Sequence, residues 1–126
     1  MQVRRLDHVN IQTTQLDKMV AWYEEILGLR TGPRPAFPFP GAWLYAGGNA
    51  VIHLVGHDGT PAVGSELDLK LEHFALTATG QHTFEAKLNE RKHHYKRLEL
   101  EGVGLVQFHL RDPDRNHVHI DFAVND

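Results

Sequence analysis

The residues best suited to chemistry in this sequence are its histidines. Ten histidines and no cysteine occur among 126 residues. Histidine binds transition metals and transfers protons near neutral pH. A chain without cysteine has no disulfides, thiolate metal sites, iron–sulfur clusters or cysteine nucleophile. Metal binding or proton transfer by imidazole is therefore the chemistry that this sequence favours.

Four of the histidines lie in strand-like segments that occur twice. LDHVNI around His8 is similar to LEHFAL around His73, 65 residues later. VIHL around His53 is similar to HVHI around His119, 66 residues later. Two nearly equal offsets indicate a duplicated module of about half the chain.

Each half is predicted to form a strand, a helix and three further strands. Apolar residues three and four apart predict the first helix at 16–27, with Thr14 and Asp17 as a capping box and Gly28 as its stop. Weaker periodicity predicts the second helix at about 81–92. The later strands are expected near residue 30 and at 43–45, 50–55, 95–98, 105–110 and 117–122.

These elements predict an α+β fold, a single domain over residues 1–126 made of two tandem βαβββ modules. Module 1 is expected at about 4–56 and module 2 at about 70–123, joined by a linker at 57–69 that is rich in Gly and Pro. Each helix must cover one face of its sheet. The other face of the mixed sheet is free to curve around a concave site.

Alternation along the strands decides which side chains reach that site. Residues two apart share a face, so His119 and Asp121 lie opposite the apolar residues of the last strand. The same rule puts His53 on the open face, and His8 and His73 occupy repeated positions. We expect the four histidines to converge, either on a metal ion or as the lining of a metal-free polar groove.

A segment rich in proline and aromatic residues is the candidate substrate pocket. Phe37 and Phe39 alternate with prolines, which predicts a stiff, extended loop that binds a small aromatic molecule or covers a sheet edge or dimer contact. Trp43 and Tyr45 share a strand face and are candidates for its lining. Arg111 is a candidate partner for an anionic group.

Composition excludes several partners. The net charge of −3 argues against nucleic acid, which needs a concentrated basic face. No apolar run approaches the roughly 18 residues of a membrane span, and charged residues stand where a secretory signal would be apolar. We therefore expect a cytoplasmic protein with no membrane partner.

The motifs of this chain resemble those of the vicinal oxygen chelate superfamily, which includes glyoxalases, bleomycin resistance proteins and extradiol dioxygenases. The resemblance spans residues 6–122. It is carried by LDHV at 6–9, YEEILGL at 23–29, AVIHL at 50–54, LEHF at 71–74 and RDPDRN at 111–116. It implies two βαβββ modules around a concave site.

The resemblance also implies a ligand set. Members hold a divalent transition metal (Fe, Zn, Ni, Co, Cu or Mn) by side chains that match His8, His53, His73 and His119. This chain departs from the family where His119 replaces an acidic ligand, and where Arg115 replaces the glycine of the turn. Either His119 or Asp121 could be the last ligand; we favour His119, with Asp121 as its hydrogen-bond acceptor or as the catalytic base.

The implied function is a metal-dependent enzyme acting on a small aromatic or carbonyl compound. The metal would chelate two neighbouring substrate oxygens, with dioxygenase-like or lyase and isomerase-like chemistry. The alternative is a metal-free, ligand-sequestering protein resembling the bleomycin resistance members. The resemblance further implies a homodimer, with each site closed within one chain or between two chains.

Overall fold

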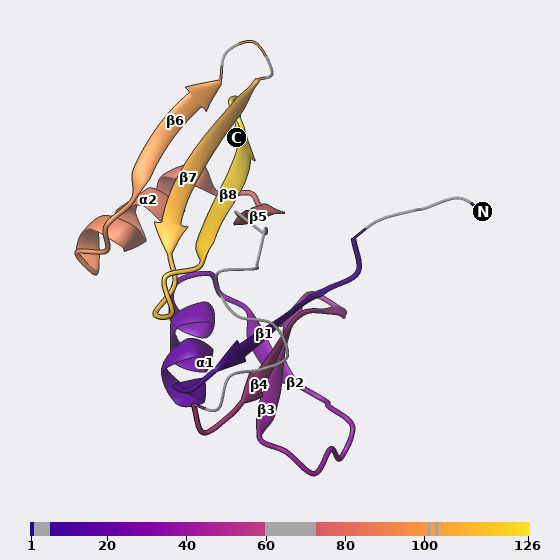
Figure 1. The fold of residues 1–126 in the computed structure, drawn as a ribbon. Helices are drawn as coiled ribbons and strands as arrows, with labels where there is room; N and C mark the ends of the chain where they lie inside the picture. The colour runs from indigo at the N-terminus through magenta and orange to yellow at the C-terminus, as the bar shows by residue number, and fades with distance from the viewer. Residues whose placement is uncertain (2–5, 60–72, 101, 103) are drawn as a thin grey trace. The chain divides into compact units, whose positions relative to one another are not determined.

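The computed structural model describes residues 1, 6–59, 73–100, 102 and 104–126. The chain divides into two compact units, Met1–Asp68 and Leu69–Asp126. Within the described residues, each unit contains one helix and one four-stranded sheet (Figure 1). The linker expected at 57–69 lies mostly outside the described residues.

The first unit begins with a strand whose partner is the last strand of the same unit. Its elements are β1 (Val9–Thr13), α1 (Leu16–Glu25), β2 (Arg30–Gly32), β3 (Gly41–Ala46) and β4 (Asn49–Gly56). The sheet order is β1-β4-β3-β2. β1 pairs with β4 in parallel, and the two other pairings are antiparallel.

The second unit repeats this plan. Its elements are β5 (His73–Thr77), α2 (Gln81–Glu90), β6 (Lys96–Leu100), β7 (Leu105–Arg111) and β8 (His117–Ala123). The order β5-β8-β7-β6, with β5 parallel to β8, matches that of the first unit. The predicted α+β fold of two βαβββ modules is therefore confirmed.

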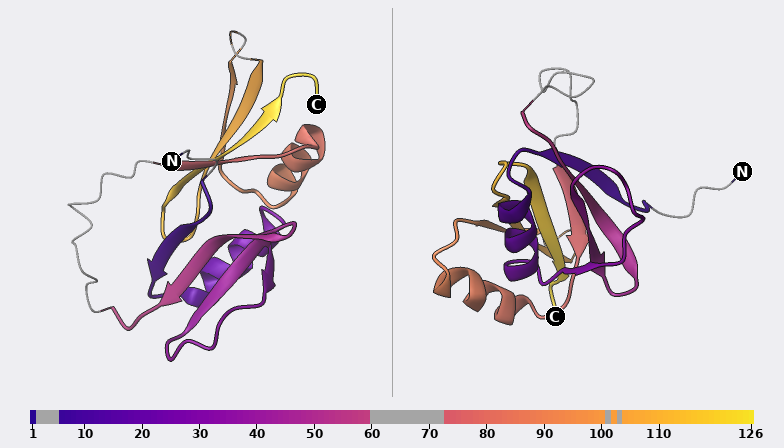
Figure 2. Two further views of the ribbon diagram at one scale, coloured as in Figure 1. Left: turned by 90° about the vertical axis from the view of Figure 1, so that its right-hand side faces the viewer. Right: turned by 90° about the horizontal axis from the view of Figure 1, so that it is seen from below.

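Each core lies between a helix and one face of its own sheet (Figure 2). In the first unit, Met19 and Tyr23 of α1 are fully buried, as is Leu44 of β3. In the second, Phe84 of α2 contacts Phe108 and Phe122, with both ring-centre distances 5.6 Å. The period-two alternation thus separates an apolar face under the helix from a polar face.

Both helices in the described part of the chain lack the length and apolar character of a membrane span.

The start of α1 differs from the prediction. The residue before the helix is Gln15, and no side chain caps it, so the expected capping box of Thr14 and Asp17 is wrong. Instead, the Thr13 hydroxyl accepts the backbone N–H of Gln15 at 3.0 Å. Thr13 is buried at the end of β1, where tertiary packing decides its conformation. The predicted stop is confirmed, because Gly28 has a φ of 71°.

The start of α2 is capped from a distant part of the sequence. The Asp126 carboxylate accepts the backbone N–H of Gly80 at 2.5 Å and that of Gln81 at 2.8 Å, both through Oδ2. These groups have no partner inside the helix. A carboxylate at a helix N-terminus also lies favourably in the field of the helix dipole. Asp126 therefore supplies a cap that α2 lacks locally.

Removing this cap should destabilise the second unit. We expect Asp126→Ala to lower the free energy of unfolding by about 1 kcal/mol, measured by urea denaturation, because two N–H groups lose their acceptor. Asp126→Asn is the matched control, since its amide oxygen still accepts and the loss should be smaller. An alanine variant as stable as the parent would show that the cap contributes nothing.

The turn between β7 and β8 contains a strained residue. Arg115 has a φ of 69°, a conformation that glycine adopts without a steric penalty. The turn is held by Asp112, which accepts from the backbone N–H and the side-chain amide of Asn116, each at 2.8 Å. The resemblance implies a glycine at the position of Arg115, and the positive φ there is a conformation that glycine favours.

Relieving this strain should stabilise the protein. We expect Arg115→Gly to raise the free energy of unfolding by about 0.5–1 kcal/mol, measured by thermal or urea unfolding. Arg115→Ala removes the same side chain but keeps the Cβ, so it should bring no such gain. Equal stability of the two variants would assign the effect to the side chain and contradict this account.

Candidate functional site

Strand pairing puts His53 and His119 at equivalent positions of the two sheets. In the first unit, Asn10 lies opposite His53 across the parallel β1–β4 pair. In the second, Ala75 lies opposite His119 across β5–β8. Asn10 and Ala75 each follow a histidine by two residues, His8 and His73. The duplication seen in the sequence is therefore repeated in the backbone register.

In the first unit, His53 lies inside a column of stacked rings. Its ring centre is 3.9 Å from that of His8 and 4.0 Å from that of Trp43, with interplanar angles of 12° and 9°. The Nδ1 atom of His8 lies 2.8 Å from Asp7 Oδ2. Burial lowers the pKa of His53, and the positive charge of His8 lowers it further.

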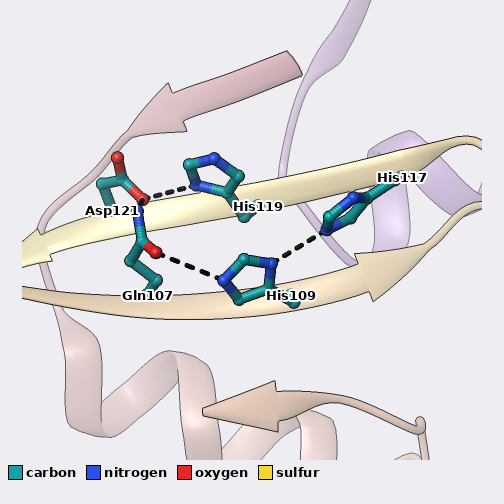
Figure 3. Close-up of polar contacts among 5 residues, drawn as sticks. All are labelled: Gln107, His109, His117, His119 and Asp121. Carbon is teal, nitrogen blue, oxygen red and sulfur yellow. Dashed lines mark hydrogen bonds and ion pairs between the residues drawn. The ribbon is translucent and has the colours of Figure 1, made fainter. Parts of the chain in front are cut away.

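In the second unit, His119 belongs to a hydrogen-bonded network on β7 and β8 (Figure 3). His119 Nδ1 lies 2.6 Å from Asp121 Oδ1. The amide Nε2 of Gln107 donates to the same oxygen at 3.2 Å. His109 joins Gln107 Oε1 through Nε2 at 3.3 Å and His117 Nε2 through Nδ1 at 2.8 Å.

The chemistry of these groups sets the direction of each hydrogen bond when the histidines are neutral. The Gln107 oxygen only accepts, so His109 donates from Nε2 and has a lone pair on Nδ1. His117 therefore donates from Nε2 to His109. The Asp121 carboxylate accepts, so His119 donates from Nδ1 and keeps a lone pair on Nε2. This is the tautomer that a metal ligand needs.

The pKa of His109 responds to this crowding. Burial lowers it from the ordinary value of about 6.5, and the charges of His119, His117 and Lys96 lower it further, while Asp121 acts in the opposite direction. The folded protein therefore binds this proton less readily than the unfolded chain. The neutral His109 ring therefore contributes to the stability of the fold above about pH 6.5, and this contribution is lost as the pH falls below that value.

The candidate substrate residues form other contacts. Phe37 and Phe39 stack on each other with ring centres 5.1 Å apart, and the Arg34 guanidinium lies 5.1 Å from both ring centres. Both rings are exposed. The Tyr45 hydroxyl donates to Pro33 O at 2.6 Å, which ties down the start of this loop.

Of the two remaining candidates, one lies in the stacked column and the other at a turn. Trp43 stacks on His53. Arg111 donates to Arg115 O at 3.3 Å, within the β7–β8 turn. The structure thus brings Trp43 to a predicted ligand, whereas Phe37 and Phe39 form a separate pair with Arg34.

Sequence reasoning missed three members of the network. None of Gln107, His109 and His117 is among the predicted site residues. Strand alternation at 105–110 would have shown Gln107 and His109 on the polar face. The hairpin register then puts His109 opposite His119. The missing signal was that register, which depends on the conformation of the turn.

The donor chemistry fits a divalent transition metal. Neutral imidazole is a preferred ligand of Zn, Cu, Ni and Fe, and a ligating histidine usually donates its other N–H to a carboxylate or carbonyl oxygen. His119 does so toward Asp121. Among the described residues, no group of three or more His, Asp or Glu already surrounds one ion position. Metal binding would therefore require imidazole rings to turn.

The sequence comparison identifies the family. Residues 5–120 match the profile of the Glyoxalase/Bleomycin resistance protein/Dioxygenase superfamily, and the chain belongs to this superfamily. Among curated proteins, no sequence is significantly similar to this chain.

Solved structures share the fold at low sequence identity. A glyoxylase/bleomycin resistance protein/dioxygenase domain from Frankia sp. EAN1pec is 21% identical, with a TM-score of 0.76 over 97% of this chain and 93% of that one. Lactoylglutathione lyase from Agrobacterium tumefaciens is 15% identical, with a TM-score of 0.67 over 91% and 90%. A genomically encoded fosfomycin resistance protein from Listeria monocytogenes is 11% identical, with a TM-score of 0.69 over 97% and 95%.

The electrostatic account of His109 can be tested through Lys96, which lies opposite it on β6. Lys96→Gln removes a positive charge that disfavours the imidazolium, so the pKa of His109 should rise toward its ordinary value. An NMR titration of the His109 ring in chelator-treated protein measures this change. Lys87→Gln, which removes a lysine of α2, is the control and should leave the midpoint in place. A fall in the midpoint of the Lys96 variant would contradict the assigned cause.

Proposed function

We propose that this chain is a metal-dependent enzyme of its superfamily that acts on a small aromatic or carbonyl compound. His8, His53, His73 and His119 would hold a divalent transition ion. The observation that carries the proposal is the repeated register, which gives His53 and His119 equivalent places in two sheets. In each sheet a second imidazole lies close by, with ring centres 3.9 Å apart for His8 and 4.7 Å apart for His73.

Asp121 is the proposed base and also orients His119. Its Oδ1 atom accepts from His119 and Gln107, so Oδ2 takes neither of these hydrogen bonds. Oδ2 can therefore accept a proton from a substrate carbon or hydroxyl and return it to the product. The Gln107 amide limits rotation of this carboxylate, which keeps Oδ1 on His119 while Oδ2 exchanges the proton.

A bound divalent ion would supply Lewis acidity to two neighbouring oxygens of the substrate. The protein's own contribution is the orientation of His119 by Asp121. Trp43 stacks on His53, and this stack must open when the His53 ring turns toward an ion. An apolar or aromatic substrate body could pack on Phe37 and Phe39, which are exposed on a tied loop.

A metal-free binding protein is the second candidate. It is supported by the near-parallel column of Trp43, His53 and His8. Two imidazoles that ligate one ion direct their lone pairs to a common point, whereas parallel rings direct them side by side. A column of this kind instead resembles a stacking surface for a planar ligand. The homodimer and the cytoplasmic location stay predictions.

Metal analysis tests the proposal. We expect protein purified without a histidine tag, or reloaded after chelator treatment, to bind about one equivalent of a divalent transition metal. His8→Ala and His53→Ala should each weaken binding at least about ten-fold, and Asp121→Asn should weaken it about ten-fold through His119. Elemental analysis and calorimetric titration measure the stoichiometry and affinity.

The matched control is the double variant His82→Ala/His94→Ala, which removes two exposed histidines of the second unit. It should bind metal like the parent. Unchanged affinity after loss of His8 and His53 would overturn the proposed ligand set. If the parent binds no transition metal under any loading condition, the metal-free binding protein is the correct function.

A further inference from the structure

Four histidines gather on one face of the second sheet. They are His73 of β5, His117 and His119 of β8, and His109 of β7. His73 lies opposite His117 and His109 lies opposite His119 in the strand register. All four therefore lie within one unit.

Their rings are closer together than the sheet alone requires. Side chains directly opposite on neighbouring strands lie about 5 Å apart, and diagonal neighbours about 7–8 Å. The opposite pairs agree, at 5.2 Å for His73–His117 and 4.9 Å for His109–His119. The diagonal pairs do not, at 4.7 Å for His73–His119 and 5.1 Å for His109–His117. The rings of both diagonal pairs therefore lean toward each other.

This spacing matches imidazoles that share one ion. With metal–nitrogen bonds of about 2.0–2.1 Å, ring centres lie about 5.2 Å apart in a tetrahedron, and about 4.5 Å (adjacent) or 6.4 Å (opposite) in a square. The four distances above fall between 4.7 and 5.2 Å. The fifth, His117–His119, is 6.2 Å.

The outer hydrogen bonds of two rings are already in place. His109 donates from Nε2 to Gln107 Oε1 at 3.3 Å, which leaves its Nδ1 lone pair on the side of His117. His119 donates from Nδ1 to Asp121, which leaves its Nε2 lone pair. Gln107 also donates to Asp121, so one amide links both supports. Ligating histidines are usually oriented in this way.

We propose that the second unit carries a metal site complete in itself, with His73, His109, His117 and His119 as ligands for a late first-row divalent ion such as Co²⁺, Ni²⁺, Cu²⁺ or Zn²⁺. It needs no residue of the first unit. It shares His73 and His119 with the ligand set of the proposed function, so one ion occupies one set or the other. The neutral nitrogen donors favour these ions over Mg²⁺ and Ca²⁺.

Binding requires imidazole rings to turn, because among the described residues no three donors already surround one ion position. His109 Nδ1 and His117 Nε2 are 2.8 Å apart, and they must part to about 3.3 Å to ligate one ion tetrahedrally. The His117 proton moves from Nε2 to Nδ1 through solvent, with no net proton release. His119 is buried, whereas His73 is exposed, so an ion can approach from the side of His73.

The test uses the full chain carrying His8→Ala/His53→Ala, in which the other ligand set keeps only two imidazoles. Titration with Co²⁺, followed by visible absorption, should show one equivalent bound in four-coordinate geometry. Adding His109→Ala/His117→Ala should weaken Co²⁺ binding at least ten-fold. Adding His82→Ala/His94→Ala instead should leave it unchanged.

NMR provides a measurement that does not depend on the folding of the quadruple variant. In the His8→Ala/His53→Ala protein, Zn²⁺ should shift the ring nitrogens His109 Nδ1 and His117 Nε2. Absence of both Co²⁺ binding and these shifts would overturn the inference and leave the proposed function standing. Conversely, if His8→Ala/His53→Ala leaves the metal affinity of the protein unchanged, the proposed ligand set is refuted and this site is supported.

Discussion

The polar face of each unit depends on parallel pairing between its first and last strands. The pairing puts Asn10 opposite His53 and Ala75 opposite His119, so a second histidine stands two residues before each partner. A slip of one residue would turn every side chain of the slipped strand to the other face, which would exchange imidazoles for core residues. Buried Ile52 and Val118 beside these histidines make such a slip costly. Apolar packing thus secures the position of the polar groups.

The two units share a backbone plan but differ in the chemistry mounted on it. Trp43 lies opposite His53, and the equivalent position opposite His119 is His109. The first unit therefore builds a stacked column, while the second builds a network that ends on Asp121. Equivalent places in the two sheets therefore carry different side chains with different contacts. The second unit consequently has the richer supply of donors and acceptors.

Much of the fold follows from short-range patterns in the sequence. Alternation with period two predicts which face of β8 is buried, and the repeat predicts a second copy of the same sheet. Contacts between residues far apart in the sequence could not be predicted from these patterns. The cap of α2 comes from Asp126, 45 residues beyond Gln81, and no local pattern marks it. The position of His109 depends on a hairpin register that the turn with Arg115 sets. The strands that carry the candidate site were thus predicted from the sequence, but only some of the residues that contact its histidines were.

The cap on α2 also extends the folding unit beyond β8. Residues beyond the last strand of a unit are often poorly ordered unless a specific contact ties them down. Here β8 ends at Ala123, yet Asp126 holds Gly80 and Gln81 through its side chain. Loss of residues 124–126 would leave every described strand intact and still release the start of α2. The folded unit therefore includes the carboxylate of Asp126, beyond its last described strand.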